Sequence, residues 1–170
     1  MPVLFIDESK SKRYLFAVTV VEDAYVSKYR KRLQKLVKPG QRSIHFSSES
    51  DSRRRKILAE MCQLNLRVSL IETNLSYELS ARGHCFEQAL ALATSVKASR
   101  IVIERDDSLF NFDENCLKAL LRVMNLKTSL SFEHAYKHED PLLWVSDAVA
   151  WCQNRGGEWE RASSPLIRSD

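Results

Sequence analysis

The chain has 170 residues, of which 44% are hydrophobic and 28% are charged, and its formal net charge is +4. This length allows a single domain over residues 1–170 with a full hydrophobic core, and the composition excludes a disordered or fibrous protein. No apolar run approaches the roughly 20 residues that a membrane-spanning helix needs, and no basic segment precedes the first apolar run. We therefore expect a cytoplasmic protein without a membrane partner.

The first apolar run, residues 3–6, is typical of a strand that is buried on both faces. Asp7 and Glu8 follow it directly. A carboxylate in this position either caps the following turn or forms one wall of a site, because ligands of α/β proteins collect at the carboxyl ends of the strands. Residues 13–21 are rich in aromatic and β-branched residues, and the short polar loop before them predicts an antiparallel hairpin.

Two helices are expected next, before the chain returns to the sheet. Residues 24–37 and 48–65 carry apolar residues at helical spacing, and residues 43–46 between them are predicted to be extended. The basic clusters 28–32 and 53–56 lie on the solvent faces of these helices. This part of the chain is therefore a basic helical segment between the second and third strands.

The rest of the chain alternates strands with helices, which predicts a largely parallel sheet after the antiparallel start. Asp113 and Asp140 are expected to cap two of these helices. The expected strands cover residues 66–73, 100–104 and 130–134, and the expected helices cover residues 85–98, 113–124 and 140–153.

The last expected helix is apolar nearly all round, yet it contains Asp147 on its core-facing side. Leu143 and Trp151 lie four positions away on either side, so the carboxylate shares a face with large apolar side chains. A buried carboxylate needs a hydrogen-bond donor or a cation. For this residue taken alone, a bond to a backbone amide or to an arginine is the ordinary explanation.

Three acids share such an apolar setting: Asp7, Glu104 and Asp147. The ends of the first and fourth strands would lie side by side in a parallel pair, and the last helix could cover them. Three converging carboxylates would repel one another unless a divalent cation lay between them. Oxygen-only ligation favours Mg²⁺ or Mn²⁺ over zinc, and such a site can activate water for phosphodiester cleavage.

The charge is divided unevenly along the chain. Residues 1–67 contain 15 Lys and Arg against 7 Asp and Glu, whereas residues 68–170 contain 11 against 15. This division suits a polyanion that is bound on one side and cut on the other, although two solvated helix faces would also explain the basic clusters. The residues predicted to contact nucleic acid are Lys28, Arg32, His45, Arg53 and Arg54.

Three histidines are candidates for phosphate contact or proton transfer. His45 can take either part or be a structural histidine. His134 and His138 lie close in sequence to Asp140 and Asp147 and could act in the same way. His138 belongs to a polar turn, so we expect it to be exposed to solvent.

These motifs resemble the uncharacterised domain family numbered 3800, which is itself similar to the ribonuclease H-like superfamily. The resemblance rests on the segments 5–9 (FIDES) and 143–150 (LWVSDAVA) and on a middle strand that ends in an acid. It implies a ribonuclease H-like mixed five-stranded sheet with helices on both faces, and residues 24–65 as a helical insertion after strand two. It also implies roles in metal binding and catalysis for Asp7, Glu104 and Asp147, with Glu8 as a supporting catalytic group.

The function implied by the resemblance is that of a nuclease that uses Mg²⁺ or Mn²⁺ to hydrolyse RNA, DNA or a hybrid. The alternative is a ribonuclease H-like module without catalysis that binds nucleic acid, a protein partner or a second copy of itself. A third interpretation makes the acids unrelated capping or core groups. Lys10 stands where the family usually has glycine. The middle-strand acid is more often Asp, so Asp106 or Asp107 could replace Glu104, and Glu87 is the candidate for an additional acid.

Overall fold

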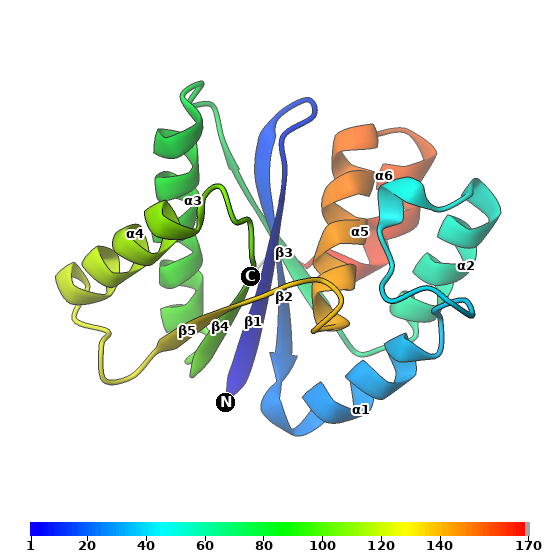
Figure 1. The fold of residues 1–170 in the computed structure, drawn as a ribbon, viewed down its shortest axis with the longest axis horizontal. Coiled ribbons are helices and arrows are strands. Elements are labelled where there is room, and N and C mark those ends of the chain that lie inside the picture. The colour runs from blue at the N-terminus through cyan, green and yellow to red at the C-terminus, as the bar shows by residue number, and fades with distance from the viewer. Residues whose placement is uncertain (169–170) are drawn as a thin grey trace.

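The computed structural model describes residues 1–168, and these form an open five-stranded sheet in the order β3-β2-β1-β4-β5 (Figure 1). Strand β1 (Pro2–Ser9) pairs antiparallel with β2 (Tyr14–Glu22), which pairs antiparallel with β3 (Arg67–Thr73). Strands β4 (Arg100–Glu104) and β5 (Ser131–Ala135) extend the sheet from β1 in parallel. The predicted mixed sheet, with an antiparallel start and a parallel second half, is confirmed.

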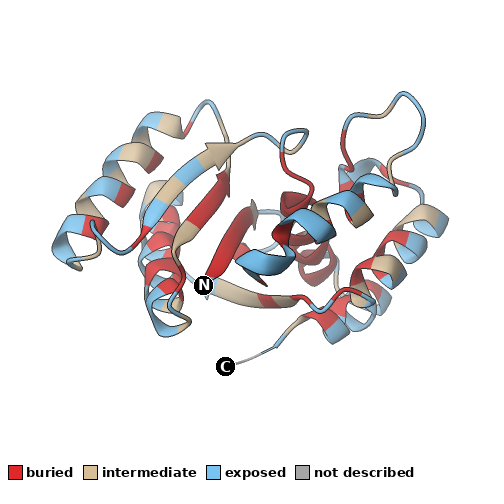
Figure 2. Ribbon diagram, turned by 90° about the horizontal axis from the view of Figure 1, so that it is seen from below, coloured by how far each residue is buried: buried red, intermediate tan, exposed pale blue. Residues whose placement is uncertain are grey.

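One face of the sheet is covered by α3 (Glu78–Ser95) and α4 (Phe110–Val123) (Figure 1). Their buried stripes pack with Leu4 and Ile6 of β1 and with alternate residues of β2 and β4. Figure 2 shows that the central strands are buried, whereas the outer strands are partly exposed. The parallel half of the sheet is therefore covered on this face by the two helices that follow β3 and β4 in the chain.

The other face is covered by α5 (Leu142–Arg155), which packs directly on β1 and β2. Helix α1 (Asp23–Gln34) packs on β1 and β2 beside α5. Helix α2 (Asp51–Cys62), which follows the 3₁₀ turn η1 (Phe46–Ser48), lies farther from the sheet (Figure 1). They form the helical insertion that was predicted between the second and third strands. The apolar character of α5 on all sides follows from this double coverage, because the sheet buries one side and the insertion buries another.

Strand alternation divides the two acids of β1 between the two faces. Val3 and Phe5 belong to the core under α5, whereas Leu4 and Ile6 belong to the core under α3 and α4. Because side chains alternate along a strand, Asp7 points to the α5 face. Glu8 therefore points to the opposite face, where the contacts described below place it.

Several predicted boundaries were wrong. Helix α3 begins at Glu78 instead of residue 85, because its first turns bury Arg82 and so lack a continuous apolar stripe. Asp113 lies inside the first turn of α4 and is buried, so it does not cap that helix. Residues 43–46 form no strand, although the backbone of His45 is extended as predicted, and Phe46 begins η1. The helix α6 (Glu158–Ser163) was not predicted.

The last described residues lie beside the outer strand β3. After α6 a second 3₁₀ turn, η2 (Ser164–Leu166), leads to Ile167, which forms a parallel bridge with Val68 of β3. Among the helices of residues 1–168, none is both long and apolar enough to cross a membrane.

Candidate active site

Asp7, Glu104 and Asp147 lie together at the carboxyl ends of β1 and β4, and their carboxylates surround the side-chain ammonium of Lys137. The Lys137 Nζ atom is 3.2 Å from Asp7 Oδ2, 3.0 Å from Glu104 Oε1 and 3.4 Å from Asp147 Oδ1. We term these four residues the acid–lysine cluster. A lysine ammonium thus takes the central position that the sequence analysis assigned to a divalent cation.

Each acid is positioned by a different part of the fold. In the parallel pair of β1 and β4, Ile6 lies opposite Ile103, which brings the next residues, Asp7 and Glu104, side by side. Asp147 is fixed by its neighbour Ser146, whose hydroxyl donates to the Phe5 carbonyl at 2.7 Å and also bonds the Thr19 hydroxyl at 2.7 Å. These buried bonds hold α5 against β1 and β2 beside the cluster.

The helical insertion also reaches the cluster, through the turn that begins at His45. The backbone N–H of Phe46 donates to Asp147 Oδ2 at 2.9 Å. Arg54 stabilises this turn, because its guanidinium donates hydrogen bonds to the Phe46 and Ser47 carbonyls. The same guanidinium lies 4.3 Å from the centre of the Trp151 ring. His45 is exposed and directly precedes the Phe46 amide that binds Asp147, so it lies at the rim of the site.

Asp7 and Glu104 behave as a proton-sharing pair. Burial raises the pKa of Asp7 well above its ordinary value, and the hydrogen bond to Glu104 and the charge of Asp147 raise it further, against the opposing charge of Lys137. Burial also opposes ionisation of Glu104, but the hydrogen bond with Asp7 and the charge of Lys137 together lower its pKa. Of the two carboxyl groups, Asp7 is therefore the one that binds a proton more readily.

The oxygen atoms of Asp7 agree with this assignment. Oδ1 accepts the backbone N–H of Glu8 at 2.8 Å, which leaves Oδ2 as the atom that can carry the proton. Oδ2 is buried and has no hydrogen-bond partner of fixed geometry within residues 1–168. A proton on Oδ2 that is donated to Glu104 satisfies both atoms.

Lys137 remains charged in this setting. Burial alone would lower the pKa of its ammonium, but the charges of Asp7, Asp147 and Glu104 outweigh burial and raise that pKa above its ordinary value. One ammonium is thus shared among three carboxyl groups. The acids can therefore attract a further cation when Lys137 is in place.

The donor atoms suit a hard divalent cation, but the present arrangement does not hold one. Among residues 1–168, no three His, Cys, Asp or Glu side chains form a ready metal site. The reason is the central ammonium: N–O distances of 3.0 to 3.4 Å exceed the about 2.0–2.1 Å at which Mg²⁺ binds oxygen. A metal would fit these acids only after Lys137 has withdrawn and the carboxylates have moved inward.

A cavity of about 310 Å³ opens at the same end of the sheet. Asp7 and Glu104 form part of its wall, together with Arg105 from the loop after β4. Lys137 does not line this cavity, so the ammonium approaches the two acids from another direction. Glu104, whose side chain keeps 28% of its exposure, is therefore open to a small ligand from this side, whereas the Asp7 side chain is almost wholly buried.

Glu8 belongs to a second charge cluster on the opposite face of the sheet. Arg82 donates to Glu8 Oε2 at 2.7 Å and makes two bonds, of 2.6 and 2.7 Å, to the carboxylate of Asp113. The hydroxyl of Tyr14 also donates to Glu8. We term Arg82, Glu8, Asp113 and Tyr14 the arginine cluster. Glu8 therefore points away from the three acids, although it lines the same cavity as Asp7 and Glu104, and its supporting role stays a prediction.

The alternative acids near Glu104 are both engaged in the loop after β4. Asp106 accepts the backbone N–H and the hydroxyl of Ser108, at 2.9 and 2.6 Å, and so fixes the turn. Asp107 accepts from Arg105 at 2.8 Å. Both line the cavity, but Glu104 is the residue that contacts Lys137. The middle-strand acid of the cluster is therefore Glu104.

Two other candidates, Glu87 and His134, lie on the face of the sheet opposite to the acid–lysine cluster. Glu87 is exposed on α3, which covers the face opposite to α5. His134 of β5 packs against the Phe110 ring of α4, with ring centres 4.9 Å apart, and lies 3.3 Å from Glu114. Strand alternation turns His134 toward α4, away from the three acids, and its part in phosphate contact or proton transfer stays a prediction.

The predicted nucleic-acid contacts divide into two groups. Arg53 donates to the Leu36 carbonyl at 2.7 Å and contacts Glu49, and Arg54 supports the turn at Phe46 as described above. These two arginines hold the insertion together. Lys28 is exposed on α1, and Arg32 is half-buried on the same helix.

Lys137 is the site residue that sequence reasoning missed, because it lies in a polar turn that reads as solvent-exposed. Two signals could have found it. First, the side chains of alternate residues along β5 point to the same face of the sheet. Glu133 and Ala135 point to the α5 face, so residue 137 is expected to point there as well. In addition, three buried acids require a cation, and this turn supplies one between the last strand and the helix of Asp147.

In comparison with known proteins, no protein-family model matches the chain, and no curated protein matches its sequence.

Proposed function

We propose that the acid–lysine cluster is the active site of a divalent-cation-dependent enzyme that hydrolyses phosphodiester bonds in nucleic acid. The supporting observation is the convergence of Asp7, Glu104 and Asp147, from three remote segments, on a single ammonium. One ammonium neutralises one carboxylate, so the cluster keeps more negative charge than a structural ion pair needs. Retaining that charge is unfavourable for folding, and it is expected where a further cation binds during function.

Asp7, Glu104 and Asp147 would hold Mg²⁺ or Mn²⁺, because all three offer hard oxygen donors. When bound, such an ion supplies an activated water and stabilises charge on the leaving oxygen. Lys137 is well suited to give up its central position. Its flexible side chain carries a compact point charge, which can move from the carboxylates to a phosphate oxygen of the substrate.

Proton transfer would be handled by the chain's own residues. The opposite pKa shifts of Asp7, raised by burial, and Glu104, lowered by its hydrogen bond with Asp7 and by the charge of Lys137, suit this pair to accept and release a proton. His45 is exposed at the rim beside Glu104, where it can carry a proton between the site and solvent. Asp147 stays oriented by the Phe46 amide throughout.

The substrate class follows from the charge division along the chain. The insertion carries exposed basic residues, Lys28 among them, on the same side of the sheet as the three acids. A phosphate backbone bound along the insertion would bring a phosphodiester to the open end of the sheet. RNA, DNA and a hybrid all carry the required backbone.

Metal binding provides the first test, because it does not depend on activity. Lys137→Met removes the competing ammonium at similar side-chain volume. We expect Mn²⁺ to bind Lys137→Met at least about tenfold more tightly than wild type, as measured by calorimetry and by the rise in melting temperature. Lys118→Met, an exposed change on α4, is the matched control and should behave as wild type. Equal, negligible Mn²⁺ binding by wild type and Lys137→Met would contradict the metal site.

Cleavage provides the second test. Purified protein is incubated with labelled RNA, DNA and hybrid substrates in Mg²⁺ or Mn²⁺. Asp7→Asn and Asp147→Asn should each abolish cleavage, whereas Glu133→Gln, an exposed acid of β5, should not. Identical cleavage by wild type and Asp7→Asn would identify a contaminating nuclease.

One observation favours a second candidate, a nucleic-acid-binding module without catalysis. The ammonium of Lys137 already occupies the centre of the acids, as expected of a site in which a fixed cation has replaced the metal. Under this hypothesis wild type binds nucleic acid with strong salt dependence but cleaves none of the substrates, and Lys137→Met gains no metal affinity.

A further inference from the structure

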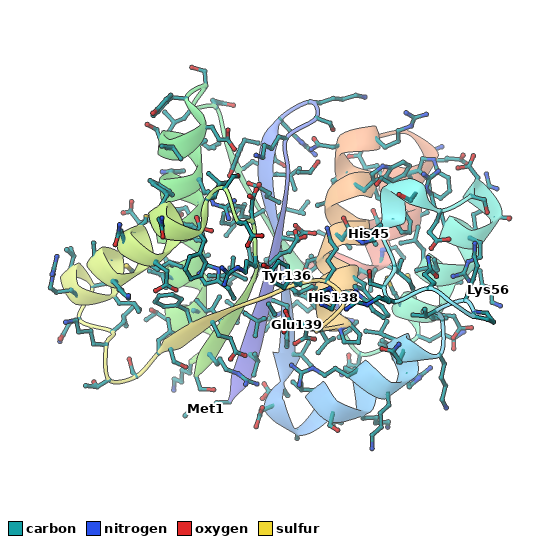
Figure 3. All side chains as sticks on the ribbon, viewed as in Figure 1. Met1, His45, Lys56, Tyr136, His138 and Glu139 are labelled. Carbon is teal, nitrogen blue, oxygen red and sulfur yellow. The ribbon has the colours of Figure 1, made fainter. Side chains whose placement is uncertain are left out.

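Two exposed aromatic rings flank Lys137 in the loop after β5. Tyr136 and His138 stack with their ring centres 5.5 Å apart and their planes 7° from parallel. Both residues are exposed, whereas the side chain of Lys137 between them keeps only 14% of its exposure. The loop therefore directs its cation inward to the three acids. Tyr136 and His138 lie close together on the loop (Figure 3) and are exposed.

The rings are held in place although they are not buried. The hydroxyl of Tyr136 donates to Asp107 at 2.7 Å, and its backbone N–H donates to Glu139 at 2.9 Å. The guanidinium of Arg105 lies 5.7 Å from the centre of the Tyr136 ring and 4.0 Å from that of Phe110. A chain of stacked π groups thus runs from Phe110 through Arg105 and Tyr136 to His138, which is its exposed end.

A fixed, exposed ring surface favours a ligand with a flat π face. Rings whose only role is to stabilise the fold would contribute more to stability if they were buried in the hydrophobic core. The core lies only a few residues away along the chain. The rings are also next to the residue that contacts all three acids, so a ligand on them would lie at the entrance of the site. Nucleobases stack on aromatic side chains with little dependence on sequence.

We propose that Tyr136 and His138 form a stacking platform for an unpaired nucleobase, and that the substrate is therefore single-stranded nucleic acid. This inference deepens the proposed function and rests on it. Bases inside a duplex are stacked and paired, so they cannot present a face to a protein ring, whereas single strands, loops and ends can. The base would stack on the open side of His138 and place its adjoining phosphate toward the acid–lysine cluster.

The test measures binding without cleavage. Fluorescence anisotropy in the presence of EDTA compares a labelled single strand of about 10 nucleotides with the same sequence as a duplex. We expect wild type to prefer the single strand. His138→Ala and Tyr136→Leu should each weaken single-strand binding about tenfold, and an abasic substitution in the strand should weaken wild-type binding similarly.

Matched variants separate loss of the rings from loss of structure. His138→Phe keeps a ring and should bind the single strand as wild type does. Tyr136→Phe keeps the ring without the bond to Asp107, so its binding should change less than about twofold. His84→Ala, an exposed histidine on α3, should have no effect. Far-ultraviolet circular dichroism of each variant should match wild type.

The outcomes also separate this inference from the proposed function. Ring-dependent binding of the single strand without metal-dependent cleavage would support the platform and contradict the hydrolase. Cleavage that requires the acids but not the rings would support the hydrolase and contradict the platform. Either of two results would overturn the platform. One is equal affinity of wild type for the duplex and the single strand, and the other is single-strand binding by His138→Ala as tight as that of wild type.

Discussion

The two charge clusters lie at the same end of the sheet, one on each face, and they differ in how completely their charges are paired. In the arginine cluster, Arg82 makes two short bonds to Asp113 and a third to Glu8. In the acid–lysine cluster, one ammonium is shared among three carboxylates at 3.0 to 3.4 Å. The side chains of Arg82 and Asp113 are almost wholly buried, whereas that of Glu104 keeps 28% of its exposure.

The difference indicates which cluster stabilises the fold and which can exchange its cation for another. A guanidinium has a planar fork of donors that matches carboxylates in fixed geometry, so the arginine cluster is locked. An ammonium is a point charge on a flexible chain, and excess acids around it can accept another cation. The alternation of β1 thus places similar residue types on two faces of one strand end. They form a fully paired cluster on one side and, under the proposed function, a cation-binding site on the other.

The largest expected effect comes from breaking the arginine cluster. Arg82→Met leaves the buried Asp113 and the adjacent Glu8 without their cation, and we expect a loss of about 3–5 kcal/mol in the free energy of unfolding. Urea denaturation measures it. The triple variant Arg82→Met, Asp113→Leu, Glu8→Gln should recover much of the loss. A loss below about 1 kcal/mol for Arg82→Met would show that the cluster is not locked.

Breaking the acid–lysine cluster should cost less. Lys137→Met leaves three acids without a cation, but Glu104 and Asp147 retain contact with water and can take up protons. We expect a loss of about 2 kcal/mol at neutral pH and recovery on adding Asp7→Asn. Urea denaturation of both variants is the measurement. A loss as large as that of Arg82→Met would contradict the contrast between the clusters.

The pH dependence of stability tests the shared proton. The pKa of Asp7 is raised in the folded protein above its ordinary value of 3.8, so the folded state binds more protons than the unfolded chain as pH rises above that value. The contribution of Asp7 to stability is therefore full below about 3.8 and declines as pH rises toward its folded pKa.

Asp7→Asn keeps the shape of the side chain but cannot ionise, so it should lack this decline. The free energy of unfolding of wild type should fall relative to that of Asp7→Asn by at most about 1.4 kcal/mol per pH unit across this window. Thermal melts from pH 4 to pH 8 measure the difference. Parallel curves for the two proteins would show that Asp7 is not the protonated acid.

The smallest effect should come from Tyr14→Phe, which removes one hydroxyl from the arginine cluster. Glu8 loses a donor but keeps Arg82 at 2.7 Å, so we expect a loss of about 0.5–1 kcal/mol. Chemical denaturation with Tyr77→Phe, an exposed tyrosine, as control resolves it. An effect equal to that of Arg82→Met would mean that the hydroxyl, not the guanidinium, organises this cluster.

Much of the fold was predictable because the strands carry strong local signals. The continuous apolar run of β1 and the alternation of strands and helices after residue 66 predicted the order and direction of the parallel half. The same reasoning brought the ends of β1 and β4 together, and with them Asp7 and Glu104. Asp147 was found because a carboxylate in an otherwise apolar helix requires an explanation.

What could not be predicted depends on long-range pairing of charges. The early start of α3 was hidden because a buried arginine interrupts its apolar stripe, and its partner Asp113 was mistaken for a helix cap. Lys137 was overlooked because a turn residue points inward only when a distant group attracts it. Arg53 and Arg54 looked like surface residues, since their backbone acceptors cannot be read from sequence spacing.

The bond from Phe46 to Asp147 gives the molecule a built-in reporter. The amide proton of Phe46 lies on a bond of 2.9 Å to a carboxylate that belongs to the cluster, so its magnetic environment must follow the charge on that carboxylate. One resonance in a ¹⁵N-resolved spectrum can therefore track cation arrival, protonation or withdrawal of Lys137 without any added probe. The same amide belongs to the insertion, so a polymer that draws the turn outward would reorient Asp147 from outside the sheet.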